Sequence, residues 1–340
     1  MGRGRELLRY SAIRLALTPV MLWLISSLVF LLLRVAPGDP VDVVLGRRAS
    51  ALTRAAMQRK LGLDQPLWHQ YVDFIRGLVH GDLSQSLIHD DDSVSQIIAR
   101  ALPASLELSL TALLVAAVIG LVIGFSGIAR PGGKLDLTGR LYGIGTYALP
   151  PFWAAMLIQL LFAVKLGWLP VGGRFPPNLL PPQGSGFLIA DSLLCGDWTS
   201  LQGALRHLVL PAGTLGLLLS GVFSRTLRLN LGRTLQSDYV EAARSRGLNE
   251  QRVVLNHALP NALLPVLTIA GITVASLIGG ALLIEVTFSW PGIALRLQEA
   301  INQRDYPVVQ GIVVVVAALM VLVSVAVDIL VALIDPRVRY

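Results

Sequence analysis

Residues 238–260 read DYVEAARSRGLNEQRVVLNHALP, a polar and basic stretch between two of the most apolar parts of the chain. Asp238 is placed to cap a helix in which Glu241 takes the third position. Gly247 can adopt the left-handed conformation that ends a helix, and Asn249 can cap a second helix toward the end of the stretch. The stretch therefore predicts a helical hairpin that stands in water between two membrane spans.

The composition places this hairpin in an integral membrane protein. The chain has 340 residues, of which 54% are hydrophobic and 14% charged, and its mean hydropathy is +0.66. The fourth of its apolar runs contains His207, Pro211 and three glycines, but removing it would scatter positive charge over both membrane faces. We therefore predict an all-α fold with six spans, each long enough to cross about 30 Å of hydrocarbon. They lie near residues 12–33, 102–128, 141–164, 207–227, 262–284 and 308–334.

The surplus of seven positive charges lies on one side of these spans. Four arginines and one acid lie around the start of the first span, and six arginines face three acids in residues 225–260. Arg130, Lys134 and Arg140 face only Asp136 between the second and third spans. The segments on the other side are balanced, with eight basic and eight acidic residues in 34–100. The positive-inside rule then places both termini in the cytoplasm, and we expect no nucleic-acid partner.

The charge pattern divides the chain into three parts. Residues 1–35 hold the N-terminus and first span, 36–101 form an external insertion, and 102–340 form a five-helix core with a cytoplasmic loop at 228–261. The insertion carries two amphipathic helical patterns, which fit either a cap over the outer mouth or a docking surface for a soluble protein. Its histidines, His69, His80 and His89, lack short fixed spacing, so we expect no metal site despite the nearby aspartates. Cys195 is the only cysteine, which excludes an intramolecular disulfide.

Small residues and prolines in the spans predict how the helices approach one another. Glycines let helix backbones come close in a membrane, and Pro150-Pro151 is expected to kink the third span. The glycines in question are Gly120, Gly124, Gly143, Gly145, Gly271, Gly279 and Gly280.

The loop and several other blocks resemble one protein family. The loop follows the pattern EAA…G…LP, at Glu241-Ala242-Ala243, Gly247 and Leu259-Pro260, and is similar to the cytoplasmic loop of permease subunits of binding-protein-dependent ABC importers. Within that family, the chain resembles the inner-membrane permease of dipeptide, oligopeptide and nickel importers that has a large external insertion after its first span. His257 departs from the isoleucine that many members carry. The blocks that carry this narrower resemblance are PGDP at 37–40, LGLDQPLWHQY at 61–71, HGDLSQS at 80–86, FSWPG at 288–292, RDYPVVQG at 304–311 and DPRVR at 335–339.

The resemblance implies a type I ABC importer permease in the bacterial inner membrane, with both termini inside. Its implied partners are a second homologous permease, two ABC ATPases, an external substrate-binding protein and membrane lipid. Cargo stays open among dipeptides, oligopeptides, glutathione, opines and nickel. The sequence contains no GxxxxGK[ST] motif, so ATP hydrolysis is expected in the partner chains, and this chain is expected to be no enzyme and to need no cofactor.

The same resemblance assigns roles within the loop. Residues expected to couple to the ATPases are Asp238, Glu241, Ala242, Ala243, Gly247, Leu259 and Pro260. The two alanines should leave a low face against which another backbone can lie. Arg244, Arg246 and Arg252 would contact either an acidic rim on the ATPase or anionic lipid headgroups.

The alternative is a secondary transporter driven by an ion gradient. Glu107, Glu285 and Asp328 lie within or at the ends of spans, where a carboxylate needs a partner or water and can serve a proton relay. Paired broken helices at matching positions of an inverted repeat would favour this alternative, and the sequence shows no such pairing.

Overall fold

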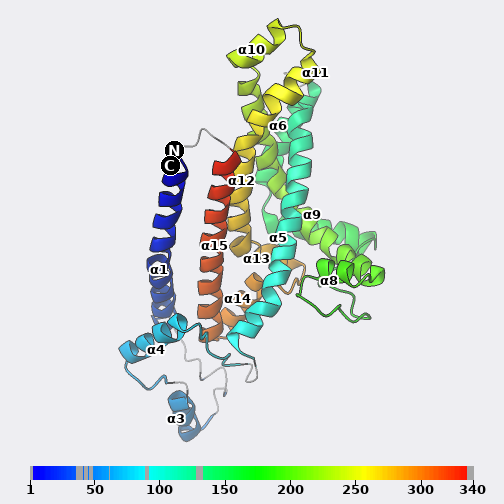
Figure 1. Cartoon of the computed structure of the whole chain (residues 1–340). Coiled ribbons are helices and arrows are strands. Elements are labelled where there is room, and N and C mark those ends of the chain that lie inside the picture. Colours follow the sequence, from blue (N-terminus) through cyan, green and yellow to red (C-terminus); the bar gives the residue numbers. More distant parts are fainter. Residues whose placement is uncertain are drawn as a thin grey trace.

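The computed structural model describes residues 3–35, 41, 45, 49–60, 62–88, 92–127 and 133–334. The blocks at 37–40 and 335–339, Arg130 and His89 lie outside these residues. The regular elements of the described part are all helices, and the only other pairing there is a single isolated bridge between Gln85 and Ser93. Figure 1 shows its elements, which are α1 (Arg3–Val35), α3 (Ala51–Lys60), α4 (Leu67–Val79), α5 (Val94–Ser126), α6 (Lys134–Ala148), α7 (Pro151–Gln159), η1 (Leu160–Lys165), α8 (Leu188–Leu194), α9 (Trp198–Thr234), α10 (Asp238–Ser245), α11 (Glu250–Arg252), η2 (Val253–Ala258), α12 (Leu259–Gly280), α13 (Leu282–Thr287), α14 (Ile293–Asn302) and α15 (Tyr306–Ile334).

Five of the described helices are long and apolar enough to cross a membrane. They are Leu15–Val35, Val94–Ser126, Trp198–Thr234, Glu250–Val274 and Tyr306–Leu330. A sixth span exists if the bent pair Lys134–Ala148 and Pro151–Lys165 crosses as one unit. Each of the six predicted apolar runs thus overlaps one of these five helices or the bent pair. The number of membrane spans is five if the bent pair does not cross the membrane and six if it does.

The third predicted span is broken where the two prolines lie. The axes on either side differ by 101°, so the predicted kink is confirmed and is close to a right angle. Pro150 adopts an extended conformation with ψ 130°, and Pro151 opens α7. A residue before proline is driven out of the helical region, and a proline fits the first helical turn because it needs no N–H there.

The fourth span, interrupted in the sequence, is continuous in the structure. α9 runs through Pro211, and His207 bonds through Nδ1 to the carbonyl oxygen of Gly203 at 2.8 Å. The second span also extends beyond its predicted start, because Ser93 and Gln96 form a capping box that opens α5 at Val94.

The α5 and α9 pair forms the centre of the fold, and glycine permits its close packing. A β-carbon built at Gly120 would lie 2.5 Å from Cβ of Phe223, and one at Gly124 would lie 2.9 Å from the carbonyl oxygen of Ser224. Gly271 lies against Val327 of α15 in the same way. Close approach is therefore confirmed at these three glycines, whereas a β-carbon at Gly145 would meet nothing within 4 Å.

The two ends of the bundle carry different structures. Figure 1 shows α10 and α11 at one end, together with the start of α1 and the end of α15. The opposite end holds α4, α3 and α14. The hairpin therefore lies at the opposite end of the long helices from α3 and α4.

Candidate functional site

The first helix of the hairpin begins one residue earlier than predicted. Ser237 is the N-cap, with extended angles φ −83° and ψ 149°, and Asp238 is already helical. The prediction that Asp238 caps this helix is therefore wrong. The Ser237 hydroxyl instead donates to the carbonyl oxygen of Thr234 at 2.5 Å, so the end of α9 uses the group that would otherwise cap α10. Asp238 and Glu241 then lie in the first turn, where negative charge favours the helix dipole.

The turn between the two helices is as predicted. Gly247 has φ +76°, the left-handed conformation in which a side chain is strained, and nothing lies within 4 Å of its would-be β-carbon. Asn249 caps α11 by accepting a hydrogen bond from the Gln251 N–H at 3.1 Å.

The second helix of the hairpin does not end near Pro260. α11 continues through the wide π-helical turn η2 directly into α12, which extends to Gly280. Pro260 lies in the first turn of α12 and has no N–H to give to the Asn256 carbonyl. The wide turn lies immediately before this missing hydrogen bond. Because no break separates α11, η2 and α12, the hairpin is continuous with a membrane span.

An apolar spine joins the hairpin to the spans. Val240 and Val253 are fully buried and pack with Ala243, Ala258 and Leu231 of α9. Burying each valine contributes roughly 1.5–3 kcal/mol. Ala243 is only 6% exposed, which corrects the expectation that both alanines form an outer face.

Arg244 clamps the hairpin from its polar side. Its Nη2 lies 2.6 Å from Oε1 of Glu250, and its Nε lies 3.0 Å from Oε2. Its Nη1 also donates to the carbonyl oxygen of Leu235, just after α9. The hydrogen bond from Arg244 lowers the pKa of the Glu250 carboxyl below its ordinary value. Arg244 therefore has an internal role, different from the predicted contact with another molecule.

The remaining predicted residues give the hairpin an exposed face. Ala242, Arg246 and Arg252 are exposed, and within the described part of the chain neither arginine has an ion pair. Tyr239 and Leu255 are also exposed, at 41% and 43%. Both were missed by sequence reasoning, although a large apolar residue in a polar stretch signals such a site. Tyr239 and Ala242 lie three residues apart on one side of α10, and Arg246, its C-cap residue, follows four residues later. Asp238, Glu241 and Pro260 are exposed as well, and Leu259 is half-buried.

A groove of about 1430 Å³ lies between the hairpin, α6 and α9. Asp136 of α6 is buried beside it, with Arg140 at 2.6 Å and Arg228 of α9 at 3.5 Å. Arg225, Arg233 and Arg244 also line the groove. Much of the positive charge of this end thus surrounds one hollow, and Asp136 ties α6 to α9.

Two of the carboxylates considered for a proton relay, Glu107 and Glu285, have fixed partners at the end opposite to the hairpin. Glu107 forms a buried ion pair with Arg174 at 2.7 Å and accepts the Ile189 N–H at 2.8 Å. Glu285 is fully buried and accepts from the Ser105 hydroxyl at 2.5 Å. Asp328 also interacts within the chain. Glu107 joins α5 to the loop at Arg174 and to α8, and Glu285 joins α13 to α5 and α14, which favours structural roles over proton transfer.

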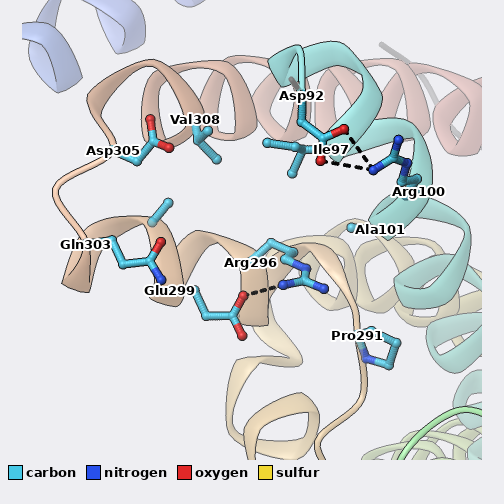
Figure 2. Close-up of a pocket in the computed structure, with 11 residues that line it drawn as sticks. Asp92, Ile97, Arg100, Ala101, Pro291, Arg296, Glu299, Gln303, Asp305 and Val308 are labelled. Carbon is cyan, nitrogen blue, oxygen red and sulfur yellow. Dashed lines mark hydrogen bonds and ion pairs between the residues drawn. The ribbon is translucent and has the colours of Figure 1, made fainter. Parts of the chain in front are cut away.

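A second hollow of about 280 Å³ lies between the start of α5 and α14. Figure 2 shows its two ion pairs, Arg100 with Asp92 at 2.9 Å and Arg296 with Glu299 at 2.6 Å. Asp305, at its edge, accepts from the Ser86 hydroxyl at 2.5 Å. Among the described residues, no three histidine, cysteine or acidic side chains gather closely enough to hold a metal ion. His89, Asp90 and Asp91 lie outside that part.

Known proteins resemble this chain along nearly its whole length. The family "Binding-protein-dependent transport system inner membrane component" matches residues 97–340, and the model of its N-terminal part matches residues 7–109. The chain is 41% identical over 335 residues to the di/tripeptide transport system permease protein DppB of Pseudomonas aeruginosa (strain UCBPP-PA14), covering 98% of this chain and 99% of that one. It is 36% identical over 320 residues to the dipeptide transport system permease protein DppB of Escherichia coli (strain K12), covering 93% and 94% of the two chains.

The fold is also found in a solved structure. The MetNI methionine ABC transporter, in an inward-facing conformation, gives a TM-score of 0.53 at 19% identity, covering 71% of this chain and 97% of that chain. The family match over most of the chain and the two near full-length relatives show that this chain belongs to the inner membrane components of binding-protein-dependent transport systems.

Proposed function

We propose that residues 238–260 carry motion from partner ATPases into the membrane spans of this inner-membrane permease subunit. The observation that supports this proposal is the joining of the hairpin to two spans at once. α10 follows α9 after only three residues, and α11 passes through η2 into α12 without a gap.

The hairpin is built to move as one body with those spans. Its apolar spine packs onto α9, and Arg244 ties α10 to α11 and to the end of α9. α9 in turn packs against α5, α6 and α12. A displacement of α10 by a partner therefore moves α9 and α12 as rigid bodies, because a packed core transmits a shift instead of absorbing it.

The ATPase would contact the exposed side of α10. Tyr239 offers apolar area, Ala242 allows a close backbone approach, and Arg246 and Arg252 offer unpaired positive charge to an acidic rim. The same arginines can also neutralise anionic lipid headgroups. Gly247 and Asn249 support this surface by setting the angle between α10 and α11.

The proposal extends to the topology, partners and cargo of the assembly. The chain crosses the membrane six times with both termini in the cytoplasm, and a second homologous permease supplies the other half of the pathway. The insertion at 36–101 faces outward, where an external binding protein docks. The cargo is a short peptide, because the relatives are named for dipeptides and for di- and tripeptides.

Substituting Ala242→Trp tests this function, because it adds bulk on the exposed side of α10 without entering the spine. We expect normal membrane levels, with co-purification of the ATPases and uptake of a labelled dipeptide each reduced about tenfold or more, equivalent to about 1.4 kcal/mol of lost contact. Ala190→Trp is the matched control, since Ala190 is an exposed helical alanine of α8 at the opposite end. Uptake at the wild-type rate in Ala242→Trp would exclude this face as the coupling surface.

A further inference from the structure

A pocket of about 220 Å³ lies at the end of the molecule opposite to the hairpin. It is bounded by the end of α1, by α4 with the turn that follows it, and by the start of α15. Figure 1 shows α4 lying beside the lower end of α1, with the start of α15 at the same end of the bundle. None of the interactions described above uses this pocket.

The pocket gathers polar atoms that lack partners. Within the described residues, five buried side-chain nitrogen or oxygen atoms have no hydrogen bond, and three belong to residues that line this pocket. They are Nε of Arg34, Oε1 of Gln70 and Nε2 of Gln310. Gln310 is only 7% exposed, so its unpaired donor is enclosed in protein. Buried polar groups are normally satisfied, and three unsatisfied atoms around one hollow indicate that something else fills it.

Two of the unsatisfied side chains, Arg34 of α1 and Gln70 of α4, are held in place by other contacts. The guanidinium of Arg34 lies 5.1 Å from the ring centre of Phe30 and 5.2 Å from that of Tyr306. No carboxylate in the described part of the chain forms an ion pair with it. The amide of Gln70 donates through Nε2 to the Gln65 carbonyl at 2.8 Å, which leaves Oε1 as its unpaired atom. The pocket is therefore preorganised but unsatisfied.

The charged residues that line the pocket have both signs, with Arg34 on α1 and the aspartates on or just after α4. Arg34 and Gln310 present donors from α1 and α15. Gln70 and Asp73 lie three residues apart on α4 and share one helical face, and Asp82 follows in the next turn. A simple anion is repelled by the two aspartates, and a metal cation is opposed by Arg34. A molecule with a carboxylate at one end and an ammonium at the other satisfies both sides.

We propose that this pocket binds a small zwitterion of the class of free amino acids and short peptides. Arg34 and Gln310 hold its carboxylate, while Asp73, Asp82 and Oε1 of Gln70 hold its ammonium. The volume far exceeds the roughly 30 Å³ share of one water molecule in the liquid, so the pocket has room for such a molecule. This site lies far from the hairpin and needs no ATPase, so binding here and coupling there can fail independently.

Equilibrium dialysis of the purified full-length chain with radiolabelled glycylglycine tests this site. Saturable binding is expected, and it should weaken about tenfold or more in Arg34→Gln and in Asp73→Asn, the change that the loss of one charged hydrogen bond brings. Gln310→Met, which keeps the size of the side chain, should weaken it severalfold. N-acetylglycylglycine and glycylglycinamide, which lack the ammonium and the carboxylate respectively, should compete poorly.

Arg296→Gln is the matched control, because Arg296 lines the other hollow at the same end. It should leave glycylglycine binding unchanged. Asp73 is exposed, so Asp73→Asn tests the site even if a change at the buried Gln310 unfolds the chain. An absence of saturable binding, or binding that Arg34→Gln leaves intact, would reduce the pocket to a hydrated cavity. Equal competition by the two blocked peptides would overturn the assignment to a zwitterion.

Discussion

The hairpin and the segments around Glu107, at opposite ends of this permease, hold charged side chains in different environments. At the hairpin end, an apolar spine is buried and the charged residues Arg246 and Arg252 face solvent. At the other end, Glu107 and Arg174 are buried as a pair. An exposed charge on a rigid support suits a partner that binds and leaves, whereas a buried pair joins distant segments of one chain. The exposed arginines of the hairpin suit the coupling proposed above, whereas the buried pair of Glu107 and Arg174 holds distant segments of the chain together.

The largest contrast between the ends should be the side of the membrane on which they lie. In a Cys195→Ala background, which removes the exposed native thiol, cysteine at Ser245 should be shielded from an impermeant thiol reagent in intact cells. Cysteine at Gln303, which is also exposed, should react fully. By the positive-inside rule, the positive charge around the hairpin predicts that this end lies inside. Labelling of position 245 from outside would reverse the assignment of the two ends.

The buried ion pair should give the largest energetic effect. Arg174→Met leaves Glu107 charged and buried without its partner, and should lower the free energy of unfolding by about 3–5 kcal/mol. Adding Glu107→Gln should recover part of this loss, because the unpaired charge is removed. Unfolding in a denaturing detergent, monitored by intrinsic fluorescence, measures both changes. If the double variant were no more stable than Arg174→Met, the pair would not be the source of the effect.

Two glycines with the same backbone conformation compare the ends directly. Gly247 in the hairpin has φ +76° and Gly196 beyond α8 has φ +67°, and a β-carbon at either would meet nothing within 4 Å. Valine at either position should impose a similar strain of about 1–3 kcal/mol. Only Gly247→Val should lose retention of the ATPases and peptide uptake, with membrane levels near normal. Equal loss of uptake in Gly196→Val would mean that strain alone, and not coupling, was measured.

The smallest effect concerns the clamp between Arg244 and Glu250. The pair is largely exposed, so Glu250→Gln should cost at most about 0.2–1 kcal/mol, and less at high salt. The pKa of Glu250 is lowered in the folded chain, so its contribution is present near neutral pH and is lost as the pH falls through that lowered value, below 4.5. Hydrogen exchange of hairpin amides, corrected for intrinsic rates, should be faster in Glu250→Gln than in the unchanged protein at pH 7. This difference should disappear in acid. Glu299→Gln, in the exposed pair of α14, should leave hairpin exchange unchanged.

Features set by one or two neighbouring residues were predictable from the sequence. The left-handed Gly247 follows from the absence of a side chain, and the cap at Asn249 from the short reach of its amide. The helical class and the apolar runs follow from composition and length. The break at Pro150-Pro151 follows from proline geometry, although its size of 101° does not.

Features that depend on competition or on distant segments were not predictable. Asp238 and Ser237 are both good caps, and only the end of α9 decides between them. Ala243 faces inward because Val253 and Leu231 lie beneath it, which no local pattern reveals. Glu107 and Arg174 are 67 residues apart in the chain. The pocket at Arg34 likewise needs three helices brought together.

The wide turn η2 sets the direction in which the hairpin points. A π-helical turn accommodates one residue more than an α-helical turn, and successive residues of an α-helix are about 100° apart around its axis. One extra residue within 253–258 therefore fixes the azimuth of α10 around the axis of α12. Deleting a single residue there would keep every exposed side chain of α10 and yet turn the whole hairpin about 100° around that axis. The number of residues in this turn thus specifies the direction in which the exposed side of α10 faces, independently of which residues form that side.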